Sequence, residues 1–400
     1  MKILLITTLY PGYKNQGRNE VTYAIHYFAQ EWVKLGHQVR IVRPWVRYPK
    51  IFNFTTKAKM TKKYGFNERL SIDSVHVDRI TINKIPKINY TQKDIDYIYN
   101  KVNNSITDEF KPNIILCHMI NPSLYIGILL KRAFNIPLIL TMHTTDLINL
   151  SKKNSRFKNY NHIKDSIDGL GFRSEKLKRD YNLLYNIEDT TNQFIIHSGI
   201  DSNFIINRSD LIKKEEKRVN SIFVASNLIP LKNVDVIIKA FNKLNNQEII
   251  LEIAGDGPEE KKLKALAENS PIRENIKFLG RLNRDRTLEK MRKSDIFVMV
   301  SSPETFGLVY LEAMASGCIV IGSKGEGIDG VIRDGENGYL CTPRDINKLV
   351  MIFDKIIKMS KVDKAKILYN TLNTAKKMTQ DEMAMKYINI LEMHCNNFNM

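Results

Sequence analysis

The sequence predicts an α/β protein built from two doubly wound, Rossmann-like parallel-sheet domains that face a cleft. Three observations support this fold class. The chain has 400 residues, more than the roughly 250–300 at which a single hydrophobic core stops growing. Short β-rich apolar runs alternate with segments of helical period, as in parallel sheets that helices cover on both faces. A polar and charged stretch at 199–220 interrupts this alternation and marks a domain boundary.

The alternation is regular in the second half of the chain. There the apolar runs predict strands, and the segments between them have the 3.6-residue period of amphipathic helices. The predicted strands are 221–225, 249–254, 276–279, 295–300 and 318–322, and the predicted helices are about 233–244, 259–268, 284–294, 307–316 and 344–359.

The first half repeats the pattern less cleanly. A helix is expected over 19–35, because Gly36 follows as a C-terminal stop. The apolar run at 2–8 suits a buried first strand better than a signal peptide. The predicted strands are near 2–8, 38–43, 113–117, 137–141 and 193–196.

The charge of the chain is unevenly distributed. The formal net charge is +18, of which residues 1–200 carry +14 and residues 201–400 carry +4. A one-sided positive field attracts anionic partners, whether nucleic acid, a phospholipid surface or a phosphorylated small molecule. Nucleic acid is not expected, because the sequence has no RNA-recognition, zinc-finger or helix-turn-helix signature.

Hydropathy and cysteine usage predict a cytoplasmic protein. No apolar stretch approaches the roughly 20 residues that a membrane-spanning helix requires. The cysteines are far apart in the sequence and form no metal-ligand or redox motif, which fits a reducing compartment and a packing role. They are Cys117, Cys318, Cys341 and Cys395.

The stretch SSPETFGLVYLEAMASG, residues 301–317, lies where a predicted strand leads into a predicted helix. In open parallel sheets, ligands bind beyond the carboxyl ends of the strands, where helix N-termini can bind phosphate. The carboxylates of Glu304 and Glu312 can each accept paired hydroxyl donors, which suits the vicinal diol of a ribose or a sugar. The alternative is that Glu304 caps the helix and Glu312 lies on a solvated face. The candidate phosphate donors are the backbone N–H groups of Phe306, Gly307, Leu308 and Val309.

This stretch resembles the fingerprint of the retaining glycosyltransferases of family 4, which have the GT-B fold. In that family two glutamates with this spacing lie within S-x-x-E-x-F/G-G…E-A-x-A-x-G. The matching residues are Ser301 or Ser302, Glu304, Phe306, Gly307, Glu312, Ala313, Ala315 and Gly317. The resemblance covers most of the chain and is denser in the second half. It implies transfer of a sugar, with retention of configuration, from a nucleotide diphosphate donor to an acceptor.

The resemblance also implies roles for residues of the second half. The segment 226–241 is similar to the family segment in which a basic pair meets the donor diphosphate; Lys232 matches its lysine, and Asn227 replaces its arginine. Gly280 and Arg281 match the positions that meet the nucleobase, which can be uracil or guanine. Glu304 is then expected to hold hydroxyls of the donor sugar and Glu312 the ribose diol. Lys232 and the amides of 306–309 are expected to stabilise the leaving diphosphate.

In the first half, the resemblance points to a histidine and a glycine loop. His143, in TMHTTD, follows a strand end, where relatives carry a histidine beside the donor sugar and the acceptor. Gly17 occupies the family's N-terminal glycine loop, and Arg18 stands where many relatives have a second glycine. Arg18 is a candidate to supply the cation that is missing at Asn227.

The family architecture implies the domain organisation. Residues 1–198 would form the acceptor-binding domain and residues 199–378 the nucleotide-sugar domain. A C-terminal helix at about 379–394 would cross back, so that 379–400 joins the first domain.

No metal or other cofactor is expected. Asp94 and Asp96 have the D-x-D spacing of metal-dependent glycosyltransferases. The apolar residues around them indicate an amphipathic helix with both aspartates facing outward. The diphosphate would then be neutralised by Lys232, a helix dipole and Arg18, and activity should persist in EDTA.

The segment 47–69, RYPKIFNFTTKAKMTKKYGFNER, interleaves lysines with aromatic residues. This pattern suits an anionic lipid surface, at about 1 kcal/mol per cation near the headgroups; a solvated loop is the alternative. It favours a peripheral enzyme at the inner face of the plasma membrane, with a lipid-linked or glycan acceptor in bacterial cell-envelope or polysaccharide biosynthesis. The lysines are Lys57, Lys59, Lys62 and Lys63.

Several functions remain open at the level of the sequence. The transferred group can be a hexosyl or an N-acetylhexosaminyl unit, from a UDP- or a GDP-sugar. A sugar-nucleotide epimerase or a phosphorylase can share the architecture. An inactive basic relative that binds lipid or RNA is a further alternative, for which Asn227 is the best argument.

Overall fold

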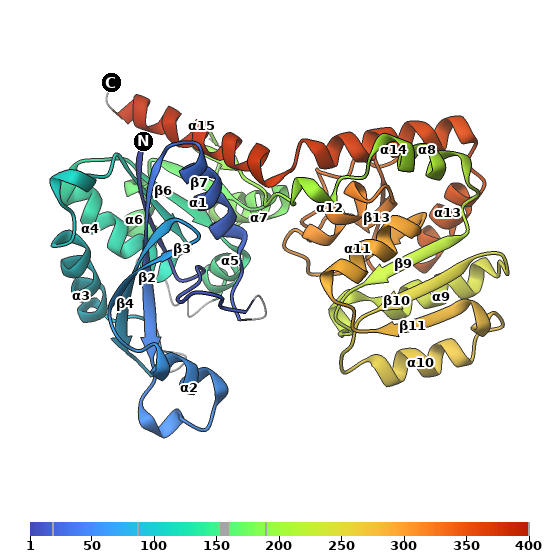
Figure 1. Ribbon diagram of the computed structural model, residues 1–400, viewed down its shortest axis with the longest axis horizontal. Coiled ribbons are helices and arrows are strands. Elements are labelled where there is room, and N and C mark those ends of the chain that lie inside the picture. The colour runs from blue at the N-terminus through green and yellow to red at the C-terminus, as the bar shows by residue number, and fades with distance from the viewer. Residues whose placement is uncertain (18–19, 86–87, 153–159, 189, 399–400) are drawn as a thin grey trace. The chain divides into compact units, whose positions relative to one another are not determined.

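A computed structural model describes the whole chain except residues 18–19, 86–87, 153–159, 189 and 399–400. The chain divides into two compact units, each with its own sheet (Figure 1). Unit 1 consists of Met1–Arg173, Leu177–His197 and Gln380–Met400, and unit 2 consists of Ser174–Lys176 and Ser198–Thr379. The sequence places the boundary at 198/199 and the return to the first domain at 379.

The sheet of unit 1 has the strand order β3-β4-β2-β1-β5-β6-β7-β8. Its neighbouring strands are parallel, apart from the antiparallel pair β3–β4. The strands are β1 Lys2–Thr7, β2 Gln38–Arg47, β3 Glu68–Ile72, β4 Val75–Asn83, β5 Ile114–His118, β6 Leu138–Met142, β7 Gly169–Phe172 and β8 Gln193–Ile195.

The helices of unit 1 pack on this sheet through apolar faces. α1 buries Phe28 and Trp32, and it packs against the C-terminal helix α15, where the Trp32 Nε1–H donates to the carbonyl of Ala384 at 3.0 Å. Figure 1 shows α15 returning along unit 1. The helices are α1 Ala24–Lys34, α2 Thr56–Lys63, α3 Gln92–Asn103, α4 Tyr125–Phe134, α5 Thr144–Leu150, α6 Tyr160–Ile163, α7 Glu175–Tyr185 and α15 Gln380–Phe398.

The sheet of unit 2 has the order β11-β10-β9-β12-β13-β14, and its neighbouring strands are parallel. The strands are β9 Ser221–Ala225, β10 Ile250–Ala254, β11 Ile276–Gly280, β12 Ile296–Val298, β13 Ile319–Ser323 and β14 Tyr339–Cys341. The helices are α8 Arg208–Glu216, α9 Val234–Leu244, α10 Glu260–Glu268, α11 Arg284–Lys293, α12 Leu308–Ala315, α13 Ile346–Ile357 and α14 Lys361–Lys376.

The predicted strands of both halves are present, and the differences from expectation are local. α1 begins at Ala24, later than predicted; before it, the Glu20 N–H donates to the Gly17 carbonyl at 2.9 Å. The strands β3, β4, β7 and β14 were not predicted. β3 is largely exposed and charged, and β7 contains two glycines, so neither has a clear apolar run.

Candidate active site

The loop between β12 and α12 carries the glutamate pair that the sequence singled out. Glu304 lies in this loop and Glu312 on α12, so both follow a central strand of the unit 2 sheet. Ser301 is fully buried, and its hydroxyl donates to Glu304 Oε2 at 2.9 Å. The strand-to-helix arrangement expected for this segment is therefore present.

Glu304 forms an ion pair with Lys232. The lysine Nζ lies 2.6 Å from Glu304 Oε2. Lys232 ends a short 3₁₀ turn, Pro230–Lys232, after β9, and β9 pairs with β12, so loops from two adjacent strands supply the pair. The side chains are 22% and 13% exposed, and their attraction is screened less than that of a surface pair.

Glu326, which the sequence analysis did not single out, holds the same loop. Its carboxylate accepts hydrogen bonds from the backbone N–H of Glu304 at 2.9 Å and from the Ser302 hydroxyl at 2.7 Å. The next residue, Gly327, approaches the loop so closely that an added Cβ would lie 1.9 Å from the carbonyl oxygen of Thr305. A single glutamate in a polar turn has no recognisable sequence pattern, so only the folded chain reveals its role.

The N-terminus of α12 lies directly after this loop. Gly307 precedes the helix with a φ of +81°, a conformation that glycine adopts without steric cost. An added Cβ there would lie 2.6 Å from the ring of Tyr310. The N–H groups of Leu308 and Val309 belong to the first helical turn, which has no acceptors for them within the helix. Phe306 is buried.

Glu312 has a different cationic partner from Glu304. Arg284, the first residue of α11, places Nη2 2.5 Å from Glu312 Oε1. Its guanidinium carbon also lies 4.7 Å from the centre of the Phe204 ring. Each carboxylate is thus held by its own cation, and Arg284 is a second site residue that the sequence analysis missed.

The expected nucleobase positions lie at the end of β11. The carbonyl of Gly280 accepts a hydrogen bond from the Gly255 N–H at 2.8 Å. Arg281 Nη1 lies 3.5 Å from Asp256, and the arginine side chain is 71% exposed. Asn227 is also exposed, and it lies in the loop that carries the site lysine.

In unit 1, His143 lies between β6 and α5. Its backbone N–H donates to Asp146 Oδ2 at 3.0 Å, and the other oxygen of Asp146 accepts the Ile120 N–H at 3.0 Å. The ring Nε2 of His143 lies 3.1 Å from Nδ1 of His118, the last residue of β5. Asp146 and the histidine pair therefore tie together the loops that follow β5 and β6.

Burial sets the protonation of this cluster. It lowers the pKa of His143 to about 3, and the nearby Arg173 acts in the same direction. Burial, His143 and Arg173 lower the pKa of His118 well below its ordinary value. Burial raises the pKa of Asp146 to about 7. Both histidines are therefore neutral at pH 7.

The glycine loop after β1 is held from within. Gln16 is buried, and its Oε1 accepts the Gly12 N–H at 2.8 Å. The hydroxyl of Tyr23 donates to the carbonyl of Gln16 at 2.7 Å. Gly17 lies in this loop, and Arg18 lies outside the described residues.

The basic and aromatic segment 47–69 is ordered rather than a plain loop. It forms a 3₁₀ turn at Lys50–Phe52, the helix α2 and the start of β3. Phe54 is 80% and Phe66 53% exposed, whereas Tyr64 stacks on Tyr13 with ring centres 3.9 Å apart. The exposed lysines of this segment are Lys50, Lys59, Lys62 and Lys63. The side chain of Lys57 lies outside the described part of the chain.

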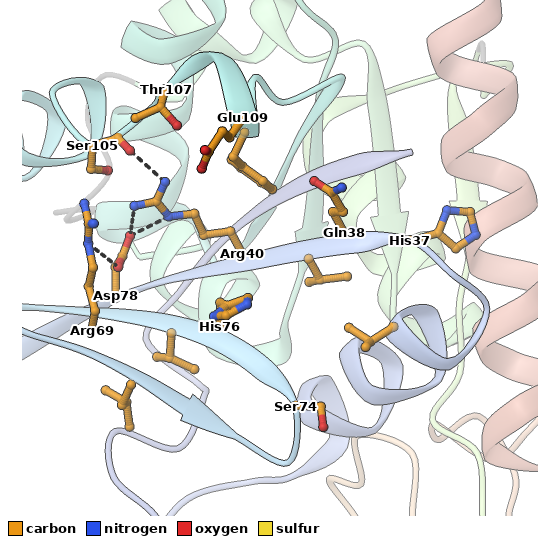
Figure 2. A pocket seen from close by; sticks show the side chains of 15 residues that line it. His37, Gln38, Arg40, Arg69, Ser74, His76, Asp78, Ser105, Thr107 and Glu109 are labelled. Carbon is orange, nitrogen blue, oxygen red and sulfur yellow. Dashed lines mark hydrogen bonds and ion pairs between the residues drawn. The ribbon is translucent and has the colours of Figure 1, made fainter.

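A hollow of about 740 Å³ lies in unit 1 at the amino ends of β2 and β4 (Figure 2). Its charged wall is internally paired: Arg40 Nε donates to Asp78 Oδ2 at 2.6 Å, and Arg69 Nε lies 3.4 Å from Asp78 Oδ1. Arg40 also donates to the carbonyl of Ser105 at 2.8 Å. Since ligands of open parallel sheets bind at the carboxyl ends of the strands, this hollow is not part of the candidate active site.

The D-x-D pair lies on α3, as expected. Asp94 forms a capping box with Thr91, and Asp96 accepts a hydrogen bond from Gln92 Nε2 at 2.8 Å. Among the described residues, no group of three or more His, Cys, Asp or Glu side chains could hold a metal ion. In the same part of the chain, no helix combines the length and the apolar character needed to cross a membrane.

Comparison with known families identifies the chain. The model for Glycosyltransferase Family 4 matches residues 21–204, and the model for Glycosyl transferases group 1 matches residues 206–372. The chain is therefore a glycosyltransferase. It belongs to the GT-B glycosyltransferases of family 4, as the sequence motif predicted.

Curated relatives share moderate identity with the chain. An uncharacterized glycosyltransferase of Methanocaldococcus jannaschii is 26% identical over 324 residues, which cover 78% of this chain and 86% of that protein. The N-acetyl-alpha-D-glucosaminyl L-malate synthase of Bacillus anthracis is 36% identical over 137 residues, 34% of this chain and 35% of that protein. The alpha-monoglucosyldiacylglycerol synthase of Streptococcus pneumoniae is 26% identical over 317 residues, 72% of this chain and 67% of that protein.

Solved structures show the same fold. A glycosyltransferase from Rickettsia africae has a TM-score of 0.72 at 20% identity, over 99% of this chain and 98% of that one. Anabaena HepE in complex with UDP has a TM-score of 0.66 at 17% identity, over 98% of this chain and 100% of that one. The predicted GT-B class, with two parallel-sheet α/β domains, is confirmed.

Proposed function

We propose that the chain transfers a hexosyl or N-acetylhexosaminyl unit from a UDP- or GDP-sugar to a lipid-linked or glycan acceptor, with retention of the anomeric configuration. The observation that carries this proposal is the Lys232–Glu304 pair, 2.6 Å long, just before the N-terminus of α12. It combines a cation for a diphosphate with a carboxylate for sugar hydroxyls.

The chemistry follows from the charge that develops on the leaving diphosphate. Lys232 and the first-turn N–H groups of α12 would face this charge, and both are in place before the reaction begins. Glu304, held by Ser301 and Glu326, would fix the donor sugar through its hydroxyls. No residue is assigned as a nucleophile. Front-face displacement and a covalent intermediate are the two routes to retention.

The remaining donor contacts would come from the loops after β11 and β12. Glu312, oriented by Arg284, would accept the two ribose hydroxyls. Gly280 and Arg281 would adjoin the base. The complex of Anabaena HepE with UDP supports uracil as the base, and guanine is the alternative to be tested.

In unit 1, His143 would line the acceptor site, and Gly17 and Arg18 would contact the phosphates of the donor. A lipid-linked acceptor is supported by the name of the Streptococcus pneumoniae relative, a monoglucosyldiacylglycerol synthase. The exposed lysines and aromatic residues of 47–69 would dock on an anionic membrane surface, as suits a peripheral enzyme of bacterial cell-envelope or polysaccharide biosynthesis.

The test is release of nucleotide from a panel of UDP- and GDP-sugars, first without an acceptor and then with candidate glycolipids and glycans. At least one donor should be hydrolysed slowly, and the matching acceptor should accelerate release. Lys232→Met and Glu304→Gln should abolish both signals, whereas Lys243→Met, an exposed change on α9, should not. Conversion of the sugar without release of nucleotide would identify an epimerase instead, and inertness toward the whole panel would overturn the proposal.

A further inference from the structure

We propose that His118 and Tyr387 are positioning residues for His143, and that they hold its imidazole in one orientation and one neutral tautomer. His118 ends β5, His143 follows β6, and Tyr387 lies on α15. All three belong to unit 1. The inference rests on the proposed role of His143 at the acceptor side.

Hydrogen-bonding contacts join these residues in a chain. His118 Nδ1 lies 3.1 Å from His143 Nε2, and His118 Nε2 lies 3.4 Å from the Tyr387 hydroxyl. The Tyr387 hydroxyl in turn pairs with Oγ1 of Thr141 on β6. His118, Thr141 and Tyr387 are fully buried, so most of this series of hydrogen bonds is shielded from water.

Because both histidines are neutral, the hydrogen bonds that link His143, His118 and Tyr387 must all run in the same direction, from donor to acceptor. A neutral imidazole has one N–H donor and one acceptor nitrogen, so only one ring can supply the hydrogen between His118 and His143. If His118 supplies it from Nδ1, its Nε2 must accept from Tyr387; if His143 supplies it, His118 must donate to Tyr387. Because burial keeps both rings uncharged, the tautomer of His143 is coupled through His118 to the hydrogen bond that His118 Nε2 forms with the Tyr387 hydroxyl.

The tyrosine itself is rigidly held. Its ring packs edge-on against Phe28 and Trp32 of α1, with ring centres 5.3 Å apart in each case, and lies 5.9 Å from the Phe194 ring of β8. The Trp32 N–H anchors α15 at the carbonyl of Ala384. The C-terminal helix thus places one hydroxyl group at the carboxyl end of β5 and β6, where it fixes the histidine pair.

A positioning role predicts an effect on turnover rather than on donor binding. The nucleotide-sugar contacts proposed above lie in unit 2, whereas the histidine chain lies in unit 1. If the His143 ring loses its support, it samples orientations that do not meet the acceptor, and kcat falls while the donor KM stays nearly constant.

The experiment compares His118→Leu, His118→Asn and Tyr387→Phe by kinetics and by long-range ¹H–¹⁵N NMR of the His143 ring. Asparagine can place a polar atom close to the position of His Nδ1, so His118→Asn should keep most of the turnover. His118→Leu should lower kcat roughly fivefold or more, the factor expected for one lost hydrogen bond, with the donor KM within twofold. The wild type should show one neutral tautomer of His143, and Tyr387→Phe should show a mixture of both.

His162→Asn, an exposed change on α6, is the matched control and should alter neither readout. Thermal unfolding of each variant shows whether it is folded. The positioning role is overturned if the tautomer of His143 is the same in Tyr387→Phe as in the wild type, or if folded His118→Leu keeps full turnover. The NMR readout needs no substrate, so it tests the chain even if the proposed transferase function fails.

Discussion

Lys232 and Glu304 lie 72 positions apart in the sequence, yet their charged atoms are 2.6 Å apart. The pair forms because β9 and β12 are neighbours in the sheet, and their loops emerge side by side at its carboxyl edge. Each side chain is mostly buried, so each charge depends on the other. A diphosphate that binds here must share Lys232 with a carboxylate already present, which links donor binding to the orientation of Glu304.

A double-mutant cycle on this pair separates stability from catalysis. Lys232→Met and Glu304→Gln should each lower Tm, because each change leaves a mostly buried charge without its partner, whereas the double variant should recover part of the loss. Donor hydrolysis should fall at least 100-fold in all three variants, since electrostatic groups of this kind contribute that much. Activity that recovers together with Tm in the double variant would show that the pair is structural.

Glu312 and Arg284 should control recognition of the ribose. The wild type should use a 2′-deoxyribose donor poorly, because one oxygen of the carboxylate would lose its hydroxyl donor. Glu312→Gln should raise the donor KM about tenfold, the effect of roughly 1.4 kcal/mol, and should use both donors nearly equally. Arg284→Leu should act in the same direction by releasing the carboxylate. If the wild type and Glu312→Gln discriminated equally between the ribose donor and the 2′-deoxyribose donor, the ribose would bind away from Glu312.

The sequence predicted those parts of the fold and site that depend on local pattern. Alternating apolar runs located β9 to β13 of unit 2 but missed β14, and a contiguous motif located Glu304, Gly307 and Glu312. Contacts between distant segments gave no such signal, because Glu326 and Arg284 are single charged residues in polar surroundings. Glu326 acquires its role only where it contacts the loop after β12, and Arg284 only where it contacts Glu312 on α12.

The same limit explains the misinterpretations in unit 1. In the sequence, His118 is a single polar residue after an apolar run, which gives no sign of a function. Its partner on α15, Tyr387, lies 269 residues away. The hairpin β3–β4 was missed because one strand is charged and exposed, which is the pattern of a solvated loop. Local periodicity identifies buried faces, but it does not pair residues across a sheet.

Donor hydrolysis should be unaffected by chelation. The charges proposed to face the diphosphate are Lys232 and the N-terminus of α12, and these need no cation. We expect the rates of donor hydrolysis in about 5 mM EDTA and in about 5 mM MgCl₂ to agree within twofold. EDTA at this concentration removes weakly bound divalent cations. Loss of turnover in EDTA that Mn²⁺ or Mg²⁺ restores would show that a metal ion assists the leaving group.

Docking on membranes should depend on the basic segment. Flotation with liposomes that contain anionic lipid should recover the wild type, and recovery should fall with rising salt as charges are screened. Changing Lys57, Lys59, Lys62 and Lys63 to glutamate should abolish it. The matched control changes four exposed lysines of unit 2, Lys361, Lys366, Lys376 and Lys377, to glutamate. Equal loss in both variants would indicate an effect of net charge and not a docking surface.

Acid should destabilise the protein through its buried histidines. Burial lowers the pKa of His118, His143 and His197 below 6.5, to about 3 for the last two. The unfolded chain therefore takes up protons below pH 6.5 that the folded chain does not, and the stability present above pH 6.5 is lost as pH falls toward 3. The raised pKa of Asp146 has the opposite effect between pH 7 and 4, but Asp146 offsets only one of these three histidines. Burial also lowers the pKa values of His26, His37 and His394, which adds to the loss of stability in acid.

Thermal unfolding at pH 7.5, 6 and 5 measures this dependence. His118, His143 and His197, less Asp146, give two net protons, which correspond to about 2.7 kcal/mol of unfolding free energy per pH unit. Tm should therefore drop by roughly 5 °C or more per pH unit below pH 6. His197→Asn should flatten the curve because it removes one of the three groups, whereas the exposed His162→Asn should leave its slope unchanged. A wild-type Tm that stays constant from pH 7.5 to 5 would mean that these rings are charged or solvated in the folded protein.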